Sequence, residues 1–154
     1  MIRAFRSFAQ SFCRNQRGAV VIEAAFVAPI LALLGLGGFQ VSQAVARQHE
    51  LQTGADDAAS MALAGWKDSS AQKTALKSVL KSTLNLTDAQ VTITNKYRCG
   101  VTVAYVDVKT ACAAGTIVAT YLQIALTDTY TPTWVEFGMG TPLNFAVTRT
   151  VVLS

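Results

Sequence analysis

The sequence predicts an α+β fold: a long N-terminal transmembrane helix that continues into a stalk, a short packing helix, and a small antiparallel sheet with one disulfide. Three observations favour this fold class. The window from Ala24 to Ala46 is uncharged and mainly apolar, residues 70–84 have apolar side chains at helical spacing, and from Gln90 the apolar spacing changes to every second residue.

The apolar window is long enough to cross a bilayer. At about 1.5 Å per helical residue its 23 residues reach roughly 35 Å, and a hydrocarbon core is about 30 Å thick. The helix then continues as a stalk through an Ala-rich polar stretch to Gly65, which is the predicted helix stop. A stripe of small and apolar residues on this stalk is suited to close packing. It consists of Leu51, Ala55, Ala58, Ala62 and Gly65.

The exported part is predicted to contain one more helix and a sheet. Ser70 is the predicted N-cap of a helix that ends near Leu84, with apolar residues on one face and lysines on another. Alternation and β-branched residues predict strands over residues 90–98, 116–131 and 144–153.

The charge distribution indicates membrane topology rather than nucleic-acid binding. The chain has 154 residues and a net charge of +4, and four arginines precede Gly18 while the other nine basic residues are balanced by nine acids. Such a basic N-terminus stays on the cytoplasmic side of the inner membrane, so the rest is predicted to be periplasmic. The predicted parts are a cytoplasmic leader (1–18), a transmembrane and stalk helix (19–65) and a periplasmic α+β domain (66–154).

Gly18 and Glu23 mark the junction between the leader and the apolar helix. Gly18 ends the basic leader, and Glu23 follows five residues later at the start of the apolar run. A carboxylate at that depth is costly, so it normally has a partner or a function. This arrangement resembles the processing site of type IV prepilins. Together with Pro29 and the GADDAA segment at 54–59, it resembles the TadE-like pseudopilins of tight-adherence (Tad/Flp) pilus systems.

The resemblance implies specific roles and partners. A prepilin peptidase would cut between Gly18 and Ala19, and Glu23 would act in assembly. Other pilins and pseudopilins and the pilus assembly platform would be the partners, and the mature protein would be an inner-membrane component that can enter the extracellular pilus. Ala24 departs from the family pattern, which commonly has an aromatic residue after the glutamate.

Two cysteines remain in the exported part, which lies in an oxidising compartment. Cys99 and Cys112 are predicted to form one disulfide, and two free core thiols are the alternative. Fully extended, the residues between them would span about 40 Å, whereas bridged Cα atoms are usually under about 7 Å apart. The chain must therefore double back or the bridge is intermolecular, and a cross-strand bridge with a small hairpin or loop is the favoured arrangement.

Motifs for catalysis, cofactor binding or metal binding do not stand out. The sequence has no Gly-rich phosphate loop, no nucleophile motif and no second Cys or His pair for zinc. The prediction is a structural protein without cofactor, metal or catalytic residues and without a nucleic-acid partner. An uncleaved, membrane-anchored periplasmic binding module is the alternative, and an enzyme is the third hypothesis.

Overall fold

The computed structural model describes residues 16–65, 69–102, 104–136, 138 and 140–153. Residues 1–15 of the predicted leader lie outside this range. The chain forms two compact units, one that reaches Ser42 and one of Gln43–Ser154, and each is described by itself. The helix α2, Gln16–Gly65, contributes to both units and ends at the predicted residue. We call its residues 43–65 the stalk.

Helix α3, Ser70–Leu84, follows the stalk and is capped at both ends. The N-cap is Ser69, not the predicted Ser70: its Oγ accepts a hydrogen bond of 3.1 Å from the backbone N–H of Gln72. The extended backbone of Ser69 leaves its side chain free to satisfy a donor of the first helical turn. At the other end Asn85 adopts the left-handed conformation, with φ 53°, and its N–H donates to the carbonyl of Lys81.

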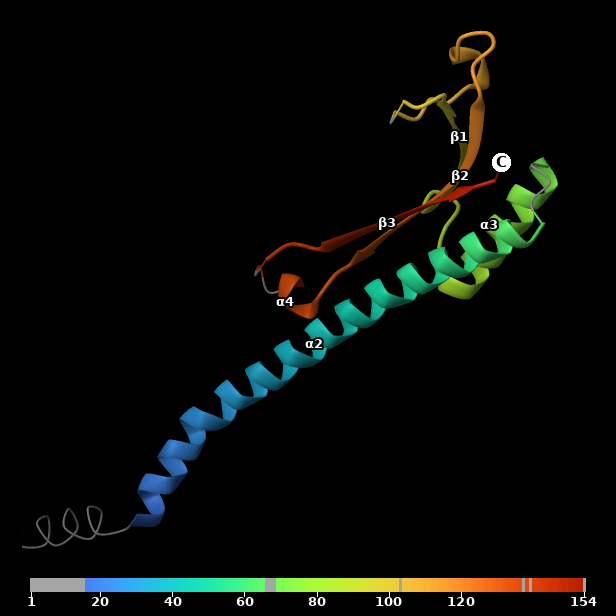
Figure 1. Cartoon of the computed structure of the whole chain (residues 1–154). Coiled ribbons are helices and arrows are strands. Elements are labelled where there is room, and N and C mark those ends of the chain that lie inside the picture. The colour runs from blue at the N-terminus through green and yellow to red at the C-terminus, as the bar shows by residue number, and fades with distance from the viewer. Residues whose placement is uncertain (1–15, 66–68, 103, 137, 139, 154) are drawn as a thin grey trace, which may run out of the picture. The chain divides into compact units, whose positions relative to one another are not determined.

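Three strands form an antiparallel sheet in the order β1-β2-β3 (Figure 1). Their bounds are Val91–Cys99, Val118–Tyr130 and Leu143–Val152, and a short helix α4, Thr133–Glu136, lies between the last two. The three predicted strands are therefore confirmed. Alternation decides which face is buried, because successive side chains of a strand point to opposite sides of the sheet.

The core of the second unit lies between the sheet and the two helices. The predicted stalk stripe supplies four of its members, whereas Gly65 is exposed. Alternate residues in the middle of β2, the apolar face of α3, the residue Leu86 after α3, and one residue each of β1 and β3 complete it. The buried residues are Leu51, Ala55, Ala58, Ala62, Leu76, Leu80, Leu84, Leu86, Val91, Leu122, Ile124, Leu126 and Val147.

The small stalk residues allow α3 to approach closely. A Cβ atom placed on Gly54 would lie 2.7 Å from Cδ1 of Leu84, which is buried at the end of α3. Glycine in a helix interior costs about 1 kcal/mol relative to alanine. Its presence here follows from packing, because any side chain at this position would displace Leu84.

Candidate functional site

The N-terminal part of α2 exposes apolar side chains all around its axis. Val20, Phe26 and Leu34, for example, are 62%, 72% and 67% exposed. Among the described residues, the helix segment Val20–Gly65 is long and apolar enough to cross a membrane, and none of its most apolar window is buried inside the chain. A helix that is apolar all round and uncovered by its own protein is suited to a bilayer rather than to water.

Gly18, Ala19 and Glu23 all lie in the first turns of this helix. Helix α2 begins at Gln16, so the Gly18–Ala19 peptide bond is helical rather than part of an extended segment. Glu23 is exposed, and the five residues from Gly18 to Glu23 correspond to about 7.5 Å along the axis. A peptidase would have to unwind the first turn of α2 to reach the Gly18–Ala19 bond.

The second unit carries the disulfide between Cys99 and Cys112, whose Cα atoms are 5.4 Å apart. The chain doubles back as predicted: Tyr97 and Val106 exchange two backbone hydrogen bonds of 2.9 and 2.8 Å. The expected cross-strand position is wrong for Cys112, which follows the short 3₁₀ helix Lys109–Ala111. The bridge therefore joins the end of β1 to a loop, because residues 107–112 turn too tightly to form a strand.

Cys99→Ser is expected to lower the free energy of unfolding by about 3 kcal/mol, because the bridge closes a short loop and restricts the unfolded chain. Urea unfolding of the oxidised protein and the variant measures this difference. Cys13→Ser, in the predicted leader, is the matched control and should leave the unfolding midpoint unchanged. Two alkylatable thiols at Cys99 and Cys112 in native protein would contradict the prediction.

Arg47 joins three elements of the second unit, and sequence reasoning missed this role. Its Nε donates to Asp128 of β2 over 2.6 Å, one terminal nitrogen donates to the Leu84 carbonyl of α3 over 2.8 Å, and the other donates to Glu50 over 3.0 Å. The other Asp128 oxygen accepts from Gln90 over 2.9 Å. The Arg47 and Asp128 side chains are only 23% and 15% exposed, so water solvates their charges poorly and each charge is stabilised by the other.

Asp128→Asn is therefore expected to destabilise the second unit by about 2 kcal/mol, since it removes a charge-assisted hydrogen bond and leaves the Arg47 guanidinium partly buried without its main partner. Asp88→Asn is the matched control. Asp88 is exposed, and the hydrogen bond from Lys81 that lowers its pKa lies in solvent, so no measurable change is expected. Equal unfolding midpoints for both variants in a urea titration would contradict the role of Arg47.

A second ion pair connects the stalk to the sheet. Arg149 of β3 donates two hydrogen bonds to the carboxylate of Asp56. Mainly through this hydrogen bonding, the pKa of Asp56 is lowered and the pKa of Arg149 is raised, which favours the charged form of both groups. Alternation along β3 places Arg149 on the side of the sheet that faces the helices. A basic side chain on that side predicts an acidic partner on one of the helices. The sequence could not identify the acid.

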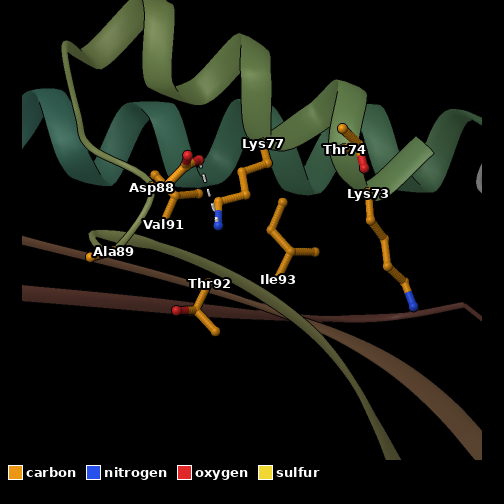
Figure 2. Close-up of a pocket in the computed structure, with 8 residues that line it drawn as sticks. All are labelled: Lys73, Thr74, Lys77, Asp88, Ala89, Val91, Thr92 and Ile93. Atoms are coloured by element: carbon orange, nitrogen blue, oxygen red, sulfur yellow. Dashed lines mark ion pairs between the residues drawn. The ribbon is translucent and has the colours of Figure 1, made fainter. Parts of the chain in front are cut away.

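A basic hollow of about 350 Å³ lies between α3 and β1 (Figure 2). Lys73 and Lys77 extend into it from α3, and Asp88 lies 3.8 Å from the Lys77 ammonium. The described residues contain no group of three metal-ligating side chains. The hollow thus places two lysines of α3 beside the first residues of β1.

The fold and the exposed helix fit a single-pass membrane anchor attached to a small α+β domain. Residues 18–60 match the family model of TadE-like proteins, so the predicted resemblance is confirmed over this segment. The match starts at Gly18 and includes Glu23, the apolar window and most of the stalk. No curated protein and no solved structure matches the chain.

Proposed function

We propose that this chain is a minor pseudopilin of a Tad-type pilus, cut between Gly18 and Ala19 by a prepilin peptidase and retained in the inner membrane by α2. The TadE-like segment suggests a component associated with the Tad pilus. The finer proposal rests on one observation: a glycine and a glutamate five residues apart begin an apolar helix directly after a basic leader.

The proposed topology follows from the charges and the disulfide. Four arginines before the helix favour a cytoplasmic N-terminus, which leaves the second unit in the periplasm. A disulfide persists in that oxidising compartment, so the Cys99–Cys112 bridge supports this orientation. The stalk then presents the second unit on the periplasmic side, where pilus subunits associate.

Exposed glycines give the anchor a means of contacting other helices. Among the described residues, no atom beyond the adjoining turns of α2 lies within 4 Å of a Cβ atom added to Gly35, Gly37 or Gly38, so this section of α2 presents open backbone. Small residues let two membrane helices approach closely. In the proposed role this section would contact the apolar helices of other pilins, and the second unit would determine which subunits meet.

The N-terminal sequence of the protein recovered from membranes tests the proposal. With an active prepilin peptidase the mature protein should begin at Ala19, and without the peptidase it should begin at Met1. A protein that begins at Met1 in both strains would reject the pseudopilin and favour an uncleaved membrane-anchored binding module. An intact basic leader would then be part of the mature protein.

A further inference from the structure

Strand β3 has a free edge. Its Leu153 N–H donates to Thr120 of β2, and backbone groups of an antiparallel strand point to its neighbour at every second residue. The even-numbered residues of β3 therefore direct their N–H and C=O groups away from β2. Within the described part of the chain, no backbone hydrogen bond other than those to β2 reaches them. They are Asn144, Ala146, Thr148, Thr150 and Val152, all exposed.

The β3 edge lacks the features that usually block strand addition. Exposed edges are commonly protected by lysine, proline or a bulge. Strand β3 has no lysine or proline, it pairs with β2 without interruption, and its one charged residue, Arg149, is held by Asp56 on the inner face. An extended backbone is the ligand that such an edge fits.

Strand β1 is the opposite edge of the sheet and is partly open. Gly100, the residue after β1, donates to the carbonyl of Ile117, the residue before β2, so the backbone groups of the odd-numbered residues of β1 point outward. Of these residues, Tyr97 is already bonded to Val106. Nearer its start, Ile93 is partly exposed at the basic hollow beneath α3, as Figure 2 shows, whereas Val91 is buried. At the level of Ile93, therefore, the outer side of β1 is partly accessible.

The two edges are in register for parallel pairing. Ile93 is opposite Ile124, which is opposite Arg149, so these three residues form one row across the sheet. In a parallel pair of strands, the N–H and C=O of one residue bond to the residues immediately before and after the residue directly opposite on the neighbouring strand. Ile93 of one copy would thus bond to Thr148 and Thr150 of the next copy, and both of these point outward.

Strand directions favour this pairing over a symmetric one. The contacts Arg47–Asp128 and Asp56–Arg149, with Asp128 opposite Phe145, show that β3 runs in the direction of the stalk. Antiparallel pairing of two β3 strands would therefore invert one stalk, which is incompatible with anchors in one bilayer. Parallel pairing of β3 with β1 keeps all stalks in one direction.

The charges near the two edges are also complementary in the row that contains Ile93 and Arg149. Asp56 lies on the stalk beside β3, level with Arg149, and its side chain is 57% exposed. Lys73 and Lys77 line the hollow together with Ile93, which is in the same row of the sheet. Side-by-side copies would bring Asp56 near these lysines, and a carboxylate that already accepts from Arg149 can accept further donors.

We propose that copies of this chain associate side by side in the membrane, with the β3 edge of one copy added in parallel to the β1 edge of the next. The interface is heterologous, so it can extend to rows of several copies. It requires a shared membrane and a common orientation, but not cleavage at Gly18. A failure of processing would consequently leave it unaffected.

Engineered cysteines in membranes test the register, in a Cys13→Ser background. Thr92 and Thr148 are both exposed, and both lie opposite Ala125 of β2. Thr94 and Thr150 are likewise both exposed, and both lie opposite Gln123. Within one chain each pair is separated by two strand spacings, about 9.6 Å, which is too far for a disulfide. Between copies the same residues would be neighbours. Mild oxidation of T92C/T148C or T94C/T150C should thus give a ladder of dimers, trimers and larger species on non-reducing gels.

Two controls decide the interpretation. The pair T92C/T150C is displaced by two residues, about 6.6 Å along the strand, and should cross-link several-fold less. Thr148→Pro in the T94C/T150C protein removes an outward N–H that β2 does not use, so it should abolish the ladder while the far-ultraviolet circular dichroism of the purified protein stays unchanged.

Three results would overturn the proposal. If T148C alone gave as much dimer as T92C/T148C, the two β3 strands would pair symmetrically. If the displaced pair T92C/T150C cross-linked as well as the matched pairs, the cross-links would come from random collision. Monomers alone, or adducts formed only with another protein, would show that a second copy does not occupy this edge.

Discussion

Gly18→Arg is expected to block processing completely, so that the protein in membranes remains heavier by its 18-residue leader. The proposed peptidase must accept the residue at the junction of leader and helix in its active site, and arginine adds both bulk and charge there. The substitution should not disturb the described part of the chain, where no atom beyond the adjoining turns of α2 lies within 4 Å of a Cβ atom at Gly18. Intact mass spectrometry of the membrane-extracted protein measures the outcome.

Gly18→Ala is the matched control for this prediction. It adds one methyl group to the same open position and favours the helix slightly, so cleavage should continue at a similar or moderately reduced rate. Membrane insertion of all three proteins should be equal, since the apolar window is unchanged. Cleavage of Gly18→Arg at the wild-type rate would show that this residue does not define the processing site.

The elements of the fold could be predicted from the sequence because their signals are local. The stalk stripe at three- and four-residue steps identified four residues that are buried in the core, and the alternation that starts at Val91 agrees with the burial of Val91 and the exposure of Thr92 and Thr94. Both patterns arise directly from the geometry of helix and strand. Gly65, at the end of the stripe, is exposed.

Long-range pairs could not be predicted in the same way. Arg47 and Asp128 are 81 residues apart, and their contact requires the order of the strands and the position of the stalk beneath them. The location of Cys112 depends on the tight turn around the 3₁₀ helix Lys109–Ala111, which the favoured cross-strand arrangement did not include. The proposed Gly18–Ala19 processing site and the proposed role of Glu23 concern contacts with other proteins, so the sequence pattern remains their main support.

Glu23→Gln is expected to leave insertion and cleavage nearly intact but to reduce sharply both co-purification with other pilins and the yield of surface pili. After cleavage, the α-amine of Ala19 would be a cation near neutral pH, about one helical turn from the Glu23 carboxylate. An unpaired carboxylate in a low-dielectric environment is penalised by several kcal/mol, and pairing with an amine relieves that cost. Glutamine keeps the shape of the side chain and removes the charge.

The assembly role follows from where a second amine can be found. A neighbouring pilin brings its own N-terminal amine to the depth of Glu23 only when the two helices pack in register, so the charge pair would favour correctly aligned subunits. Glu50→Gln is the control on the same helix: Glu50 is exposed, lies beyond the apolar window and pairs with Arg47 over 3.0 Å, so piliation should not change. Surface pili are counted by electron microscopy at matched protein levels. Normal piliation in Glu23→Gln would remove the assembly role and leave Glu23 as a residue solvated at the headgroups.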